Sequence, residues 1–270
     1  MKILGLDSSG LVASVAVVEN DVLLAEYTVD YKKTHSQTLL PMLDEIRHMI
    51  DLDLESIDAI AIAAGPGSFT GLRIGAATAK GLGLALHKPL VEVSTLEGLA
   101  YQLCGTDRLV CPLMDARRNQ VYSGIYSFRP VEQSWQMDVV KEQCAVDISV
   151  MIDACNELGR EVIFLGDGVP VYAGKLAEKM TVPYTFAPAH CNRQSAASVA
   201  SLGAVYYAQG RVVSAAQHQP EYLRMSQAER EWAEAAKVAE AAQAVCVAGA
   251  SEAMQSDGTA RAGESEEHNG

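Results

Sequence analysis

The sequence predicts a duplicated α/β protein in which two similar lobes follow one another, residues 1–107 and residues 108–224. One observation is that both halves alternate strand patterns and helix patterns in the same order. A second is that each half opens with an apolar run ending in an aspartate, Asp7 or Asp115, and that five residues separate it from the next strand pattern. Self-similarity on this scale indicates a duplicated α/β unit rather than two unrelated domains.

The first half begins with two strand patterns on either side of the polar turn Asp7-Ser8-Ser9-Gly10. Apolar residues then recur at helical spacing up to Ile50, with Ser36 as the expected N-cap and Pro41 near enough to the first turn to be tolerated. The expected elements are strands within 1–18, a strand at 22–29, a helix at 36–50, a strand at 59–65, a helix at 69–86, a strand at 90–94 and a helix at 95–103.

The second half repeats this order without repeating the residues. Its hairpin pattern again follows a leading aspartate, and its second apolar strand again runs into a glycine loop, Gly166-Asp167-Gly168. The expected elements are a hairpin within 108–128, a helix near 147–158, a strand within 161–169, a helix near 172–180, a strand at 183–188 and a helix at 195–210.

The composition changes after about residue 224. Residues 225–270 consist mainly of Ala, Glu, Gly, Ser and Gln, and nine acidic residues there stand against three basic ones. An alanine-rich helix at 225–247 would have few apolar anchors, and 251–270 is expected to be disordered. We leave this tail out of the functional interpretation.

Charge and motif content exclude several classes of function. The formal net charge of −13 disfavours direct nucleic-acid binding, because phosphate contacts need clustered Lys and Arg. The six cysteines form no C-x-x-C pair, which disfavours a zinc site or a redox motif and favours reduced thiols in the cytoplasm. No membrane span is expected, and no signal peptide, since Asp7 interrupts the first apolar run.

One candidate site is a nucleotide site formed by the turn at Asp7, Ser8 and Ser9 and by the loop at Gly65, Gly67 and Ser68. An Asp at such a turn could hold a metal-bound water, and a glycine loop that opens a helix presents free N–H groups to an anion. The Walker pattern G-x-x-x-x-G-K-[ST] is absent. The other interpretation is an ordinary hairpin turn stabilised by its own Asp and Ser side chains.

A second candidate is the small-residue stripe, Gly71, Gly75, Ala79 and Gly83, which lies at intervals of four along the predicted helix. Glycine inside a helix costs roughly 1 kcal/mol relative to alanine, so a close backbone approach is the expected compensation. The stripe could face the protein's own sheet or a neighbouring helix. It could also form a subunit interface, with the apolar helix of Leu39, Leu43 and Ile46 as its second element.

No catalytic residues and no metal ligands are predicted. The chain has no H-x-x-x-H pair and no G-x-S-x-G nucleophile elbow. A Ser-His-Asp triad could still assemble from distant positions.

These residues together resemble the bacterial TsaB family over about residues 1–224. The matching segments are LGLDSS, KTHSQTLLPML, AIAAGPGSFTGLRIG, Ala79-Lys80, MDARRNQVY and PEYLR, and GPGSFTGLRIG is the most specific of them. The resemblance implies the two-lobed fold of actin, sugar kinases and heat-shock ATPases (the ASKHA fold). It also implies a partner subunit in the synthesis of threonylcarbamoyladenosine (t6A) next to the tRNA anticodon.

The resemblance further implies a non-catalytic role, in which the homologous subunit TsaD carries the metal-binding His pair and transfers the threonylcarbamoyl group. The contact with TsaD would come from the helices at 36–50 and 69–86, through Leu39, Leu43, Ile46, Gly71, Leu72, Gly75, Ala79 and Gly83. The same surface could form a homodimer, an ATPase of the TsaE type could join, and tRNA would be reached only indirectly. No tightly bound cofactor is expected, although ATP or ADP could sit at the interface with the partner.

Two alternatives remain open at this point. One is an active enzyme of the same fold, an ATP-dependent phosphotransferase or a peptidase-like enzyme, with Asp7 near the metal. The other is direct tRNA binding through a small basic cluster of Arg117, Arg118 and Arg129.

Overall fold

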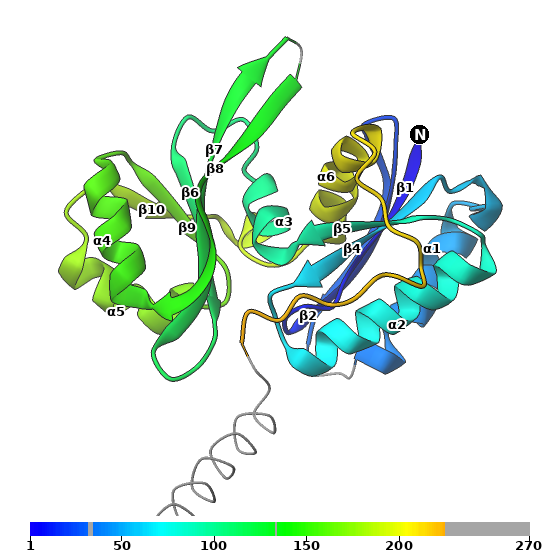
Figure 1. Ribbon diagram of the computed structural model, residues 1–270, viewed down its shortest axis with the longest axis horizontal. Helices are drawn as coiled ribbons and strands as arrows, with labels where there is room; N and C mark the ends of the chain where they lie inside the picture. The colour runs from blue at the N-terminus through cyan, green and yellow to red at the C-terminus, as the bar shows by residue number, and fades with distance from the viewer. Residues whose placement is uncertain (32–34, 133, 225–270) are drawn as a thin grey trace, which may run out of the picture. The chain divides into compact units, whose positions relative to one another are not determined.

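Two five-stranded mixed sheets carry the fold (Figure 1). In the first sheet the strand order is β3-β2-β1-β4-β5, with β1 antiparallel to β2 and parallel to β4. Its strands are β1 (Lys2–Asp7), β2 (Val12–Glu19), β3 (Val22–Asp30), β4 (Ala59–Gly65) and β5 (Leu90–Ser94). Because β1 and β4 are parallel, the turn after β1 and the loop after β4 lie at the same edge of the sheet.

The second sheet repeats the arrangement with the order β10-β9-β6-β7-β8. Its strands are β6 (Leu109–Asp115), β7 (Gln120–Val131), β8 (Ser134–Asp147), β9 (Val162–Leu165) and β10 (Tyr184–Phe186). In each sheet the first three strands form an antiparallel meander, and the fourth and fifth pair in parallel on the other side of the first. Two copies of this unit make up the actin-like fold, so the predicted fold class is confirmed.

The computed structural model describes residues 1–31, 35–132 and 134–224, and residues 1–223 form one compact unit. The helix expected at 225–247 and the disorder expected at 251–270 lie outside the described residues. No helix in the described ranges is both long and apolar enough to cross a bilayer.

Strand β8 was missed by the sequence analysis. It pairs along the length of β7, but it is an edge strand whose side chains are mostly exposed or half-buried. Its sequence therefore lacks the clean alternation of apolar and polar residues by which a half-buried strand is recognised.

Six helices of the described ranges complete the two units: α1 (Leu39–Met49), α2 (Phe69–Ala85), α3 (Thr95–Tyr101), α4 (Ile148–Leu158), α5 (Val169–Lys179) and α6 (Ala196–Ala208). Several start where the sequence offers a cap. Ser68 accepts from the N–H of Gly71 at the start of α2, and Asp147 accepts from that of Ser149 at the start of α4. Helix α4 ends at Gly159, whose φ of 65° suits a left-handed C-cap residue.

Helix α1 begins later than expected. Ser36 lies in a short 3₁₀ turn, His35–Gln37, and the N-cap position falls to Thr38 without a side-chain cap. Pro41 supplies the reason, since a proline deep inside a helix would remove a hydrogen bond and clash with the preceding turn. A start at Leu39 keeps Pro41 within the first turn.

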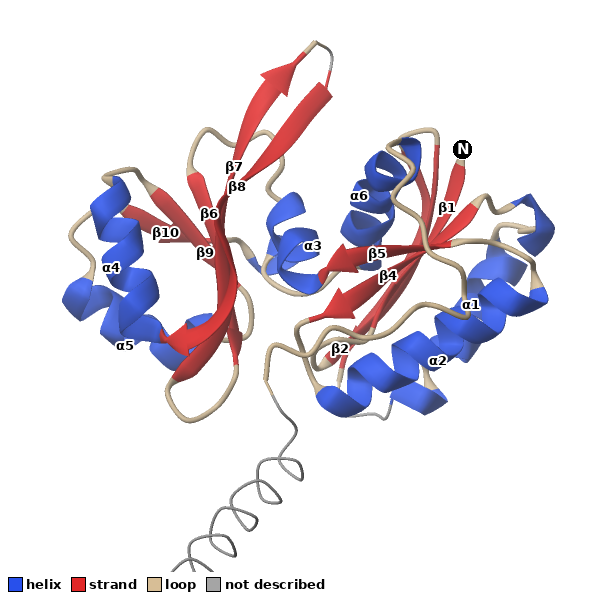
Figure 2. Ribbon diagram, viewed as in Figure 1, coloured by secondary structure: helices blue, strands red, loops and turns tan. Residues whose placement is uncertain are grey.

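The helices cover both faces of each sheet (Figure 2). Side chains of α1 and α2 join the core on one face of the first sheet, and those of α6 pack on its other face. On the second sheet, α4 and α5 cover one face, while α3 supplies Leu96, Leu99 and Ala100 to the other.

The position of α6 corrects one expected boundary. Residues 108–224 were assigned to the second lobe, but α6 packs on β1, β2 and β4 of the first sheet. The segment after it also returns to the first sheet, where Val213 pairs with Leu90. The second sheet and its own helices therefore end before α6.

Candidate functional site

The turn after β1 is closed by its own side chains. Asp7 Oδ1 accepts hydrogen bonds from the Ser9 backbone N–H at 2.8 Å and from Ser9 Oγ at 2.7 Å. The Asp7 carboxyl is buried, and this burial raises its pKa to about 6, although the two bonds from Ser9 and the nearby His35 act in the opposite direction. The carboxyl thus serves first as an acceptor within the turn.

The glycine loop after β4 lies directly on this turn. The Ser68 N–H donates to the Ser9 carbonyl oxygen at 2.6 Å, and Ser8 Oγ donates to the Gly71 carbonyl oxygen at 2.9 Å. A Cβ added at Gly67 would overlap the Ser9 carbonyl oxygen, and one at Gly71 would overlap that of Ser8. The absent side chains therefore make room for the backbone of the neighbouring turn.

Gly65 makes room for a different segment. Its φ is 132°, a value that favours glycine, and a Cβ there would overlap the carbonyl oxygen of Glu221. The Glu221 N–H in turn donates to the Ala64 carbonyl oxygen at 2.7 Å. Beside it, the rings of Phe69 and Tyr222 stack with their centroids 4.4 Å apart.

The structure brings together five of the six residues of the predicted nucleotide site, Asp7, Ser8, Ser9, Gly67 and Ser68, and sets Gly65 against Glu221. Carbonyl oxygens of Ser8 and Ser9 face the glycines where a phosphate would need to approach. Carbonyl oxygens repel an anion, so this arrangement favours the interpretation as a packed structural turn.

The small-residue stripe faces the protein's own sheet. A Cβ at Gly75 would meet Ser8 Oγ and, at 3.2 Å, Ile62; one at Gly83 would meet Ala215 at 3.0 Å and Leu90 at 3.1 Å. Ala79 is fully buried in the core between α2 and the sheet. The predicted partner contact through Gly71, Gly75, Ala79 and Gly83 is therefore corrected: the close approach that these residues permit is intramolecular.

The apolar residues predicted to accompany the stripe are also core residues. Leu39, Leu43, Ile46 and Leu72 are each at most 4% exposed. Leu39, Leu43 and Ile46 pack against the first sheet and Leu72 is buried as well, so these side chains do not face a neighbour while the fold is intact. Any partner contact by α1 and α2 must use the opposite faces of these helices.

The second unit has a counterpart of the Asp7 turn. Asp115 Oδ1 accepts from the Arg117 N–H at 2.9 Å, as Asp7 does from Ser9, and also from Tyr172 Oη at 3.2 Å. A Cβ at Gly166 would overlap the Leu113 carbonyl oxygen. In both units, therefore, a glycine of the loop lies against a backbone carbonyl oxygen of a neighbouring segment, Ser9 in the first unit and Leu113 in the second.

Two further expectations can be placed. Arg117 and Arg118 lie in the turn before β7, whereas Arg129 lies near the far end of that strand, roughly 30 Å away at about 3.3 Å per residue, and pairs with Asp138. The predicted basic cluster is therefore not formed. In the described residues no group of three or more His, Cys, Asp and Glu side chains is placed to hold a metal ion.

Comparisons with known proteins identify the family of this chain. A family model described as "TsaD: tRNA N6-adenosine threonylcarbamoyltransferase" matches residues 23–232. The "tRNA threonylcarbamoyladenosine biosynthesis protein TsaB" of Bacillus subtilis (strain 168) is 32% identical over 244 residues, which cover 88% of this chain and 100% of that protein. The chain belongs to the TsaB family.

Other TsaB-family matches agree. The protein of the same description from Escherichia coli (strain K12) is 27% identical, over 83% of this chain and 95% of its own length. The solved structure "YeaZ from Pseudomonas aeruginosa" is 29% identical, with a TM-score of 0.67 over 82% of this chain and 99% of that one. Relatives described as t6A biosynthesis proteins thus match both sheets, and the predicted resemblance is confirmed.

The outward face of α2 in this TsaB-family chain is the side opposite the stripe. Its exposed residues are Thr70, Arg73, Ala77, Gly81, Leu84 and Ala85. A Cβ added at Gly81 would have no atom within 4 Å, so this glycine is not explained by packing inside the lobe. Leu84 is 59% exposed, and Leu40 on α1 is 53% exposed.

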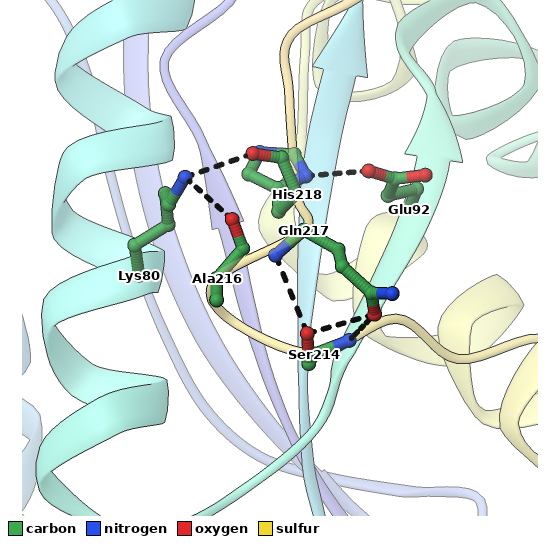
Figure 3. Close-up of polar contacts among 6 residues, drawn as sticks. All are labelled: Lys80, Glu92, Ser214, Ala216, Gln217 and His218. Carbon is green, nitrogen blue, oxygen red and sulfur yellow. Dashed lines mark hydrogen bonds and ion pairs between the residues drawn. The ribbon is translucent and has the colours of Figure 1, made fainter.

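The strap, which we define as residues 211–222, runs from α6 back across the first sheet to the glycine loop. Figure 3 shows how it is held. Lys80 of α2 donates through Nζ to the carbonyl oxygens of Ala216, at 3.2 Å, and His218, at 3.0 Å. The buried His218 ring contacts Glu92 of β5, with 2.7 Å between Nδ1 and Oε1.

Sequence reasoning missed the strap contacts. Lys80 was noted only as part of a family motif, and Glu92 and His218 were not selected at all. The available signal was the small-residue stripe itself, because Gly83 lets α2 lie close to Leu90 of β5 and to Ala215 of the strap.

The Lys80 contacts lead to a testable prediction. Replacing Lys80 with methionine keeps the apolar stem but removes two charge-assisted hydrogen bonds, which stabilise the strap by about 1–2 kcal/mol. Amide hydrogen exchange at Val213 and His218 should become roughly tenfold faster or more. Lys179→Met, at the end of α5, is the control and should leave these two amides unchanged; equal protection in both variants would contradict the role of Lys80.

Proposed function

We propose that this chain is a non-catalytic subunit of a t6A synthesis complex and binds a homologous TsaD-type subunit through the outward faces of α1 and α2. It acts in the cytoplasm, a TsaE-type ATPase joins the same complex, and tRNA is reached through the partners. ATP or ADP, where it takes part, binds with the partner subunit rather than tightly to this chain alone.

The packing of the glycine loop carries the non-catalytic part of the proposal. Gly67, which a nucleotide site would use to approach phosphate, faces the carbonyl oxygen of Ser9, and Gly71 in the first turn of α2 faces that of Ser8. The N–H of Ser68, an otherwise free donor at the start of α2, already donates to Ser9. With the Ser68 N–H used and carbonyl oxygens in the anion's place, the loop is suited to holding β1 and α2 together.

The outward face of α2 supports the partner contact. Alanine in place of glycine stabilises an exposed helix by about 1 kcal/mol. At Gly81 an alanine side chain would meet no other atom of the lobe, so neither helix propensity nor internal packing accounts for the glycine there. Gly81 and Ala77 together form a shallow strip next to the exposed Leu84. Such a strip lets the backbone of another helix approach closely.

The test is a substitution on this strip. Gly81→Arg should weaken binding to the TsaD-type subunit of the same source at least tenfold, because a long charged side chain separates the two helices. The measurement is the dissociation constant by calorimetry with both purified subunits. Unfolding is not expected, since the new side chain meets open space.

Gly174→Arg is the matched control. Gly174 lies within α5 of the second unit and also has no atom within 4 Å of an added Cβ. It should bind the partner like the unmodified chain. Unchanged binding in Gly81→Arg and in Ala77→Arg would exclude the outward face of α2 as the interface.

The alternative of an active ATP-dependent enzyme is tested separately. Calorimetry with Mg-ATP on the single chain should show no micromolar binding. Turnover of ATP that disappears in Asp7→Ala would refute the non-catalytic role.

A further inference from the structure

A cavity of about 380 Å³ lies beside the strap, lined by residues of β5, α3, β7 and β8 as well as the strap itself. Four of its lining residues are carboxylates, Glu92, Glu97, Glu142 and Glu221, and the single cation among them is Arg211. The Arg211 guanidinium lies 3.5 Å from the centroid of the Tyr206 ring. The cavity therefore favours a cationic ligand and disfavours a nucleotide.

The hydroxyl of Tyr126 gives this cavity a second, independent feature. Tyr126 is 1% exposed, it lines the cavity, and its hydroxyl makes no hydrogen bond within the described residues. It lies close to Gly124, which has no side chain to displace it. Among the residues that the structure describes, the Tyr126 hydroxyl is therefore left without a protein partner at the cavity, where it can form a hydrogen bond with a ligand.

Glu97 stands at the junction with a second cavity of about 440 Å³. Its carboxylate accepts from Tyr206 Oη at 3.0 Å, and burial raises its pKa above the ordinary value. Three residues line both cavities, Glu97, Val139 and Arg211. The two spaces are therefore neighbouring parts of one groove.

The second cavity has a mixed lining, in which aromatic and apolar side chains stand beside polar ones such as Ser134, Gln136 and Gln209. Its walls include Tyr101, Trp135 and Tyr206, together with Met137, Leu202 and Val205. Gly105 packs against the indole ring of Trp135, and a Cβ added at Gly105 would lie 3.4 Å from that ring. Aromatic walls of this kind bind flat apolar groups and also attract cations.

We propose that the two cavities form one binding site for a small organic ammonium ion with an aromatic body. The ammonium group donates to Glu97 and Glu142 and to the hydroxyl oxygen of Tyr126, and the ring lies against the indole of Trp135. The chain's own tail is a poor occupant, because residues 225–270 carry nine acidic residues against three basic ones. This site is separate from the α2 face used in the proposed function, so either can fail without the other.

The test is calorimetry of the full chain with phenethylamine at low salt. Binding is expected in the millimolar range or tighter, in keeping with a ligand of this size. Phenylethanol lacks the charge and butylamine lacks the ring. Each should bind at least roughly tenfold more weakly than phenethylamine. Absence of phenethylamine binding up to about 10 mM would overturn the proposal.

Three Glu→Gln variants test where phenethylamine binds. Glu97→Gln should weaken binding at least about tenfold, since a hydrogen bond to a charged group is lost. Glu142→Gln, at an exposed position, should weaken it as well and covers the case in which Glu97→Gln fails to fold. Glu178→Gln on α5 removes the same charge away from the groove and should have no effect. The proposal would also be overturned if all three variants bound phenethylamine with the affinity of the unmodified chain, or if butylamine bound as tightly as phenethylamine.

Discussion

Replacing Gly71 with alanine is expected to lower the free energy of unfolding by about 2–3 kcal/mol, even though alanine is the better helix former. The added Cβ would overlap the Ser8 carbonyl oxygen, which belongs to backbone and cannot rotate away. The bond from Ser8 Oγ to the Gly71 carbonyl oxygen would be strained by the same shift. Thermal unfolding should begin roughly 5–10 °C lower.

The same helix provides the control. Gly81→Ala adds the same methyl group at a position where it meets no atom within 4 Å, and it should stabilise the chain by up to about 1 kcal/mol. If the change in the free energy of unfolding has opposite signs for the two Gly→Ala variants, the effect of packing is separated from that of helix propensity. Equal effects of the two variants would refute the intramolecular explanation of the stripe.

The contrast between these two glycines also explains what the sequence could and could not predict. Helical spacing correctly placed Gly71, Gly75, Ala79 and Gly83 on one face of α2. It did not settle which face turns inward, because the opposite side also carries small residues, Ala77 and Gly81, beside Arg73 and Leu84. The orientation is decided by the Ser8–Ser9 backbone, which lies next to α2 only once β1 and β4 are paired.

The fold was more predictable than the assignment of its last helix. Alternating patterns and the repeated aspartate were sufficient for two units in tandem, since these signals are local. Helix α6 is buried along much of its surface and has little polar face to indicate its partner. Its position on the first sheet depends on contacts between distant parts of the chain, with β1, β2 and β4. The strap that follows it depends on a distant contact as well, between Lys80 and His218.

The Asp7 carboxyl is expected to make the stability of this chain depend on pH between about 4 and 6.5. Burial raises its pKa from 3.8 to about 6, a difference that corresponds to about 3 kcal/mol. Below pH 3.8 the carboxyl is protonated in both folded and unfolded chains and costs nothing. As the pH rises, the unfolded chain ionises first, so stability is lost until the folded carboxyl also ionises near pH 6.

Asp7→Asn should remove this loss while keeping an oxygen that can accept from Ser9 N–H and Oγ. The free energy of unfolding, measured by urea denaturation from about pH 3.5 to 7.5, should therefore rise with pH in the variant relative to the unmodified chain, by about 3 kcal/mol in total. His35 lowers the pKa of Asp7 by its charge, and its Nε2 lies 2.8 Å from the Gly10 carbonyl oxygen, so the comparison is repeated in a His35→Gln background. A stability difference between the unmodified chain and the Asp7→Asn variant that stays constant across this range would mean that the carboxyl ionises in the folded turn as easily as in water. In that case the turn would be hydrated and open enough to admit a ligand, and the packed loop that supports the non-catalytic role would have to be abandoned.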